Sequence, residues 1–299
     1  MKTLRKRLKR HWQLYLLLLP ALVYLLIFRY GPMYGILMAF ENYRPKLGII
    51  GSEWVGLDHF RRLFNYPEFW TLIKNTLAIS LYTLCTFPCA IILALLFNEM
   101  KNAKFKKAVQ MATYAPYFLS TVVLCSLVIL MVGRDGPIGH LYAALTGTSV
   151  DLLTIPEYFS SIYVWSGVWQ STGWGTIIYL AALSGVSEDL VEAARLDGAN
   201  RLQVIWHVHL PGIMSTIVIM FIMQVGSILS VGFEKIFLLQ NDLNLSASNV
   251  LSTYVYDIGL VGGQFSYSTA VGLFNNVANL VMLLLANKIT KKVSGMGLM

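Results

Sequence analysis

The sequence predicts an all-α polytopic membrane protein with six transmembrane helices, and three observations carry this prediction. First, 56% of the 299 residues are hydrophobic and only 13% are charged, whereas a typical soluble domain has about 25% charged residues. Second, the hydrophobic residues gather in six segments, each close to the ~20 residues that cross a bilayer. Third, Lys and Arg concentrate in alternate connecting segments, as the positive-inside rule requires.

The first predicted span follows a basic segment, residues 1–11. It begins at Trp12 and extends to Phe28 or further, toward Phe40. A basic run before an apolar run also occurs in secretory signals, but no small-residue cleavage site follows and more spans come after it. We therefore predict an uncleaved span, followed by an irregular external loop that reaches residue 70.

The other five predicted spans alternate with charged turns on one side and polar loops on the other. They cover residues 71–97, 108–132, 158–183, 212–231 and 265–286. Pro88 and Pro116 are expected to interrupt the second and third spans, because proline lacks the backbone N–H that a helix interior uses. The loops 133–156 and 233–264 are predicted to be external.

The count of basic residues tests this topology. The four segments predicted to be internal (1–11, 98–107, 187–211 and the residues after 287) hold 15 of the 23 Lys and Arg residues. This bias predicts that both termini are cytoplasmic. It divides the chain into residues 1–70, a core at 71–290 that contains the internal loop 187–211, and a tail at 291–299.

The internal loop 187–211 predicts two short helices joined at a glycine. Ser187 is expected to cap the first helix, whose first turn carries two acidic residues that the helix dipole favours. Gly198 allows a positive φ or a close backbone approach, and Asn200 is placed to cap the second helix. Pro211 is expected to end that helix, which predicts a compact knob suited to docking a soluble partner.

The second helix of the knob carries apolar and histidine residues. Its helical spacing predicts one shared face, made of Leu202, Ile205, Trp206 and His209. His207 and His209 are two residues apart, about 200° around a helix, so they are not expected to share a metal ion.

The spacing within this loop resembles the EAA loop of permease subunits of ABC importers. The family pattern is E-A-A, three residues, G, nine residues, then I-x-L-P, and Val208 stands here in place of the isoleucine. The resemblance implies a type I ABC importer (MetI-like) permease fold of the MalF type. It also implies that the loop docks into a separate ATP-hydrolysing subunit. The residues assigned to this coupling are Glu192, Ala193, Ala194, Arg195, Asp197, Gly198, Leu210 and Pro211.

Within that set, the resemblance implies that Glu192 pairs with a basic residue of the ATPase. The alternative from the residues alone is an ion pair with Arg195 on the same helix, worth a few tenths of a kcal/mol. Both pairings remain open at this point.

A second resemblance concerns the first external loop. Residues 29–35, then Ala39-Phe40, and later 55–60 (VGLDHF) look like the LplB-type subgroup, which imports complex oligosaccharides. The resemblance implies four kinds of partner: a second permease subunit, which is a different chain; two ATP-binding cassette ATPase subunits; an extracellular solute-binding protein; and an oligosaccharide substrate. It implies a multi-pass protein of the bacterial inner (cytoplasmic) membrane.

Polar and aromatic residues inside the spans are the candidates for the substrate pathway, because polar groups in a bilayer are costly unless they face a cavity or a partner. The candidates are Trp165, Trp169, Gln170, Trp174, Gln224, Asn275, Asn276 and Asn279. The alternative is hydrogen bonding and packing between helices. For the fourth span the pathway and packing interpretations are equally favoured. For the three asparagines packing is favoured.

Several kinds of chemistry are missing from the sequence. It has no G-x-x-x-x-G-K-[ST] motif and no Gly-Lys pair at all, so any ATP must bind to another subunit. We expect no enzymatic activity, no metal or cofactor, and no nucleic-acid partner. An ion- or proton-driven secondary transporter is the alternative function, but no fully charged residue lies deep in a predicted span.

Overall fold

The computed structural model describes residues 12–295, so the basic segment 1–11 and residues 296–299 lie outside the described chain. The described chain forms two compact units. Unit 1 combines residues 12–66 with 255–274, and unit 2 combines residues 67–254 with 275–295. Helices α18 (Leu251–Tyr256) and α19 (Phe265–Ser294) each cross the boundary between the units.

Unit 1 begins with a continuous helical stretch, Trp12–Phe40. It consists of α2 (Trp12–Leu25), η1 (Leu26–Tyr30), α3 (Gly31–Met33) and η2 (Tyr34–Phe40). The expected extension of the first span toward Phe40 is therefore confirmed. The remaining elements of unit 1 are β1 (Glu41–Asn42), α4 (Gly48–Gly51), β2 (Glu53–Trp54), α5 (Asp58–Phe64) and η6 (Asp257–Val261).

The VGLDHF motif of unit 1 forms a turn and the start of α5. Strands β1 and β2 pair antiparallel, with Glu41 opposite Trp54. Gly56 has φ = +64°, a conformation that favours glycine. The His59 ring lies with Nε2 3.0 Å from the Glu41 carbonyl oxygen. The predicted loop 29–70 is thus shorter and more regular than expected.

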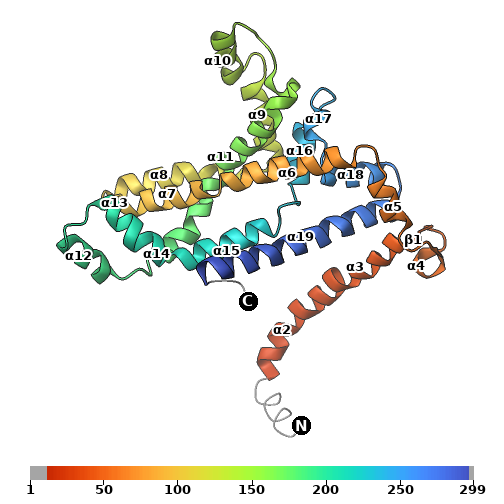
Figure 1. Ribbon diagram of the computed structural model, residues 1–299, viewed down its shortest axis with the longest axis horizontal. Helices are drawn as coiled ribbons and strands as arrows, with labels where there is room; N and C mark the ends of the chain where they lie inside the picture. Colours follow the sequence, from red (N-terminus) through yellow and green to blue (C-terminus); the bar gives the residue numbers. More distant parts are fainter. Residues whose placement is uncertain (1–11, 296–299) are drawn as a thin grey trace. The chain divides into compact units, whose positions relative to one another are not determined.

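Unit 2 contains most of the helices. In chain order they are α6 (Phe69–Cys85), α7 (Pro88–Glu99), α8 (Ala103–Tyr114), η3 (Ala115–Phe118), α9 (Thr121–Val132), α10 (Pro137–Thr146), η4 (Leu152–Thr154), α11 (Pro156–Leu183), α12 (Glu188–Leu196), α13 (Arg201–Val204), η5 (Ile205–His209), α14 (Leu210–Gly212), α15 (Met214–Val225), α16 (Phe233–Leu239) and α17 (Leu245–Ser248). The expected interruption at Pro88 is a short break between α6 and α7, which still form one nearly continuous rod in Figure 1, where α8 lies beside α7.

Four stretches of the described chain are long and apolar enough to cross a membrane. They are Trp12–Phe40, Phe69–Glu99, Thr121–Thr146 and Phe265–Lys292. A fifth arises if Arg201–Gly212 and Met214–Val225, which bend by 64° at Ile213, are taken as one span. Helix α11 has 28 residues but fewer apolar ones, and with it these stretches account for the six predicted helices.

Three predicted boundaries need correction. The predicted third span, 108–132, is interrupted around Pro116 as expected, but the spanning stretch begins at Thr121 and continues through α10 into the predicted external loop. The predicted fifth span, 212–231, is broken at Ile213, and its helix α15 ends at Val225, so residues 226–231 are not helical. The last helix continues to Ser294, into the predicted tail. In each case the sequence shows an apolar run, but local breaks and extensions of the helix leave no mark on hydropathy.

Helix α11 is the centre of unit 2, because it packs against both α7 and α8. Its close approach to α8 depends on Gly173. A Cβ at this position would overlap the backbone carbonyl of Thr113. Near it, Tyr114 Oη and Thr176 Oγ1 lie 3.2 Å apart. The glycine is therefore required by packing between the two helices.

We expect Gly173→Ala to lower the free energy of unfolding by about 1–3 kcal/mol, the usual cost of overpacking a tight contact. Thermal unfolding of the purified protein in detergent measures the effect as a lower Tm. Gly272→Ala is the matched control, since nothing lies within 4 Å of a Cβ at that helical glycine. Equal Tm values for both variants would contradict the packing role.

Candidate functional site

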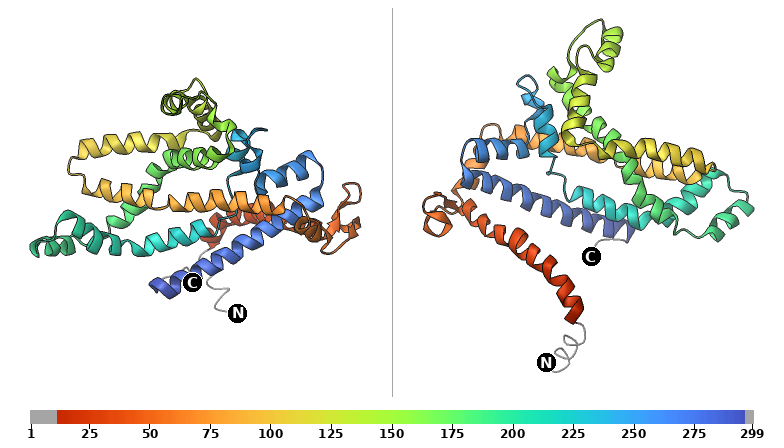
Figure 2. Two further views of the ribbon diagram at one scale, coloured as in Figure 1. Left: turned by 45° about the horizontal axis from the view of Figure 1, so that its top comes forward. Right: turned by 180° about the vertical axis from the view of Figure 1, so that it is seen from behind.

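The loop 187–211 forms a projecting knob. Helix α12 extends past the ends of α7 and α8 in every view (Figures 1 and 2). Glu192 and Arg195 are exposed on α12, and Leu196, at its end, is 89% exposed. The knob therefore presents charged and apolar side chains that no described part of the chain covers.

The turn inside the knob follows the sequence prediction closely. Gly198 has φ = +83°, and nothing lies within 4 Å of a Cβ built on it, so the glycine serves backbone conformation rather than close packing. Asn200 caps α13 through a capping box with Gln203. The prediction for Ser187 is only half right, because it occupies the N-cap position of α12 but its side chain makes no capping hydrogen bond.

The predicted shared face of the second helix is wrong. Leu202 and Trp206 are 76% and 68% exposed, whereas His209 is buried. The reason is the π-helical turn η5, which changes the angle between successive residues. The helix also continues past Pro211 to Gly212, so Pro211 stands inside the first turn of α14 and the break comes at Ile213.

The two histidines have separate surroundings. His209 Nδ1 lies 3.7 Å from Glu99 Oε1 of α7, while His207 is exposed and its Nδ1 lies 3.0 Å from the Gln203 carbonyl oxygen. This matches the predicted packing and surface roles.

Glu192 and Arg195 both line a polar pocket of about 730 Å³ beside α7. Within residues 12–295 the two side chains form no ion pair with each other. The alternative of an intrahelical pair is therefore not the arrangement in this structure, in which Glu192 is exposed.

A second, larger cavity of about 920 Å³ lies along α11 in unit 2. Its lining residues extend from Tyr163 to Ala181 on this helix, a separation of about 27 Å at 1.5 Å per residue. This length approaches the ~30 Å hydrocarbon thickness of a bilayer. The other walls come from α6, α7, η3, α15 and α16.

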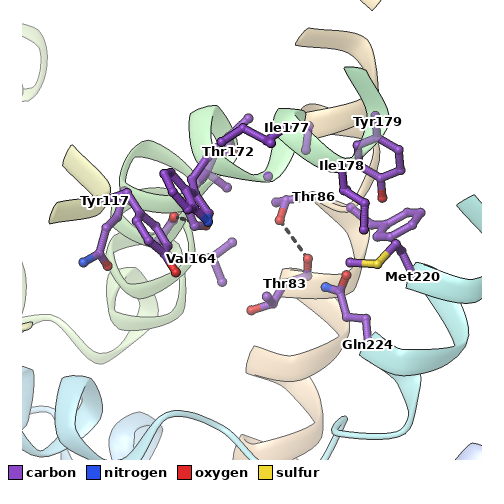
Figure 3. A pocket seen from close by; sticks show the side chains of 18 of the residues that line it. Thr83, Thr86, Tyr117, Val164, Thr172, Ile177, Ile178, Tyr179, Met220 and Gln224 are labelled. Carbon is purple, nitrogen blue, oxygen red and sulfur yellow. Dashed lines mark hydrogen bonds between the residues drawn. The ribbon is translucent and has the colours of Figure 1, made fainter. Parts of the chain in front are cut away.

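The cavity wall combines aromatic rings with small polar groups. Figure 3 shows Tyr117 on one side of the space and Met220 and Gln224 on the other, with Thr83 and Thr86 between them. The Tyr117 and Trp174 rings are stacked, with centroids 4.6 Å apart and planes 4° from parallel. Flat apolar surfaces beside hydroxyl and amide groups suit a ligand that has both C–H faces and many hydroxyls, which describes a sugar.

Three of the predicted pathway residues line this cavity: Gln170, Trp174 and Gln224. Trp165 and Trp169 do not line it; they are about half exposed, and Trp165 Nε1 donates a hydrogen bond to Tyr82 Oη at 2.8 Å. They are 4 residues apart on α11 and therefore share one outward face.

The three asparagines of α19 do not line the cavity either. Asn279 is buried. Its side chain accepts a hydrogen bond from the Leu229 backbone N–H at 2.8 Å and donates one to Ser230 Oγ at 2.8 Å. Asn276 is exposed, and Asn275 is partly buried. For Asn279 this arrangement is close to the alternative of hydrogen bonding between helices, except that its partners lie in the loop after α15 rather than in a helix.

We expect Asn279→Leu to lower the free energy of unfolding by about 1–3 kcal/mol, because the buried Leu229 N–H and the Ser230 hydroxyl lose their partner. Thermal unfolding in detergent measures this change. Asn276→Leu removes an exposed asparagine from the same helix and should leave Tm nearly unchanged. A variant at 279 that keeps its Tm but loses affinity for substrate would instead favour a pathway role.

Lys235 is a cavity residue that the sequence analysis missed. It lies on α16, outside every candidate span, yet it is only 9% exposed. Its ammonium donates a hydrogen bond to the Tyr163 carbonyl oxygen at 2.7 Å and lies 4.6 Å from the centre of the Tyr163 ring. Burial lowers the pKa of Lys235 to about 8, so most of the ammonium stays charged at neutral pH. A lysine in a predicted external loop gives no sequence signal of burial.

Residues 86–294 match the family model described as binding-protein-dependent transport system inner membrane component. Two relatives from Bacillus subtilis (strain 168) resemble nearly the whole chain. The polygalacturonan/rhamnogalacturonan transport system permease protein YteP is 46% identical over 95% of this chain and 89% of its own length. Protein LplB is 45% identical over 97% of this chain and 92% of its own.

Two solved ABC transporter structures are also similar to nearly the whole chain. A chain from the crystal structure of a bacterial ABC transporter involved in the import of the acidic polysaccharide alginate superposes with a TM-score of 0.88 at 40% identity, over 97% of this chain and 99% of the other. A chain from the alginate transporter in complex with an alginate pentasaccharide-bound periplasmic protein gives a TM-score of 0.89 at 39% identity, over 98% and 99%. The similarity thus covers both units.

Proposed function

Because this chain belongs to the family of binding-protein-dependent transport system inner membrane components, we propose that it is the permease subunit through which an ABC importer carries a complex oligosaccharide into a bacterial cell. Members of this family are transport permeases rather than enzymes. The observation that carries the proposal is the cavity along α11, which is long enough to cross most of a bilayer and is lined by aromatic and hydroxyl groups.

The names of the relatives support an oligosaccharide substrate. One relative is a permease for polygalacturonan or rhamnogalacturonan, and the alginate transporter imports a polysaccharide and has been crystallised with its saccharide-loaded periplasmic protein. By analogy, this chain would act with a solute-binding protein that delivers the sugar to the outer end of the cavity. A second permease subunit, a different chain, would complete the pathway.

The knob is the proposed site of coupling to ATP hydrolysis. Glu192 and Arg195 are exposed there, and Gly198 sets the turn between the two helices. An ATPase subunit that grips the knob would move it when ATP binding closes the ATPase pair. Because the ATPase would dock from inside the cell, residues 98–107, 187–211 and both termini would face the cytoplasm. The membrane would be the inner membrane of the bacterial cell. The basic residues of these segments favour this orientation.

Reconstitution into proteoliposomes tests the proposal. This chain, its partner permease, the ATPase subunits and the solute-binding protein would be combined, with trigalacturonate as the labelled probe. We expect uptake that requires ATP in the vesicle lumen, when the solute-binding protein is supplied outside. This uptake should persist when ionophores collapse ion gradients. Uptake that survives without ATP but stops with the ionophore would support the secondary transporter instead, an alternative that the relatives do not favour.

A further inference from the structure

We propose that the cavity along α11 is built for oligosaccharides that carry carboxylate groups, as uronic acid sugars do, and that Lys235 binds one of these carboxylates. This inference rests on the proposed function and adds the chemical class of its substrate. It assigns the recognition of charge to one residue, in a wall that is otherwise neutral.

Lys235 is the only described residue of the cavity lining with a charged side chain. No carboxylate within residues 12–295 forms an ion pair with its ammonium. Nζ can donate three hydrogen bonds, and the described chain accepts one of them, through the Tyr163 carbonyl oxygen. Two N–H groups therefore remain for a ligand.

The free energy of such an arrangement points to a ligand rather than to packing. A buried charge without a counter-ion loses its hydration without full compensation, whereas an apolar side chain of similar length would fill the same space at no such cost. A carboxylate in the cavity would offset that cost through a short, charge-assisted hydrogen bond. A neutral sugar hydroxyl would offset it only in part.

The surroundings keep the ammonium accessible from the cavity. Gly167 also lines it, and a Cβ at Gly167 would lie 3.2 Å from Nζ. The absence of a side chain on α11 at this point therefore leaves room beside the charge. The Tyr163 ring beneath Nζ holds the ammonium by a cation–π contact without neutralising it.

The position along the cavity also fits a role in selecting substrate. Helix α16 belongs to the segment predicted to be external, so Lys235 would lie near the end at which a solute-binding protein delivers its ligand. Further along α11 the wall becomes apolar, with Ile177, Ile178 and Tyr179. A carboxylate held by a single cation near the entrance would not be trapped deep in the pathway. Alginate, the substrate of the similar transporter, is described as an acidic polysaccharide.

Equilibrium dialysis of the complete transporter tests the inference. Both permease subunits and the ATPases would be assembled in nanodiscs at pH 7, without the binding protein, and titrated with labelled trigalacturonate and with its neutral methyl ester. We expect the wild type to bind the acid at least tenfold more tightly than the ester. Lys235→Met should abolish this preference and leave ester binding within twofold, while Lys235→Arg should retain the preference.

Two further variants separate charge recognition from structure. Lys74→Met removes an exposed lysine outside the cavity and should keep the preference for the acid. Gly167→Val crowds Nζ without removing its charge and should weaken binding of the acid more than of the ester, which keeps the test decisive if Lys235→Met fails to fold.

The inference is overturned if the wild type binds both probes equally or binds neither, or if Lys235→Met keeps its preference for the acid. Proteoliposome uptake distinguishes this failure from failure of the proposed function. ATP-dependent uptake of a neutral oligosaccharide, with no preference for the acid, would leave the proposed function in place and reject only the role of Lys235. Absence of ATP-dependent uptake of any oligosaccharide would reject the proposed function itself.

Discussion

Glu192→Lys is expected to lower ATP-driven uptake by at least about 30-fold, while the chain still inserts into the membrane. Glu192 is exposed on α12 and makes no ion pair with Arg195, three residues away on the same helix, within the described chain. Reversing the charge of a residue that pairs across an interface costs about 2–5 kcal/mol, or ~30- to several thousand-fold. The proteoliposome assay measures uptake, and membrane extraction measures insertion.

Two comparisons make this result specific. Asp189→Lys makes the same change of charge on the same helix, in its first turn, and should leave uptake within a few fold. Gly198→Asp should fail like Glu192→Lys, because a non-glycine residue at φ = +83° strains the backbone by about 1–3 kcal/mol and shifts α12 relative to α13. Normal uptake by both Glu192→Lys and Gly198→Asp would argue strongly against coupling through the knob.

The double variant Leu196→Ala/Leu202→Ala is expected to weaken binding of the ATPase subunit by about 10- to 100-fold. Both leucines are more than three-quarters exposed on the knob. Exposed apolar side chains on a projecting element are typical of a protein–protein interface, and truncating interface anchors commonly costs 1–3 kcal/mol. Co-purification and a binding titration with the isolated ATPase subunit measure the loss.

Leu145→Ala is the control for this pair, because Leu145 is a 79% exposed leucine on α10, far along the chain from the knob. It should bind the ATPase as the wild type does. If Leu145→Ala weakens binding as much as the double variant, a general effect of surface hydrophobicity would explain both results. Unchanged binding of the double variant would leave the charged residues as the only anchors of the knob.

Local signals in the sequence predicted the knob well. Gly198 and Asn200 act through rules that involve only a few neighbouring residues, a positive φ and a capping box, and both are found as expected. The long apolar stretches were also predictable, since a bilayer demands a fixed length of hydrophobic chain. The similarity to known permeases confirms the predicted family and fold class.

Features that depend on packing between distant segments were not predictable. His209 turns inward because a π-helical turn breaks the 3.6-residue period that placed it beside Trp206. Lys235 is buried because α16 packs onto α9 and α11, and no pattern in its own segment indicates this. Asn279 finds its partners 49 and 50 residues away in sequence, so the sequence could favour packing for it but could not identify these partners.

The 64° bend at Ile213 has a mechanical consequence. Helix α15 starts at this elbow, and its Met220, Met223 and Gln224 form part of the cavity wall, while the chain just before the elbow belongs to the knob. A tilt of α15 by about 10° around Ile213 would displace Gln224 by about 3 Å at 1.5 Å per residue. In the proposed mechanism, a movement of the knob caused by the ATPase would therefore be transmitted through α15 to the wall of the cavity, so that coupling and gating would use the same helix.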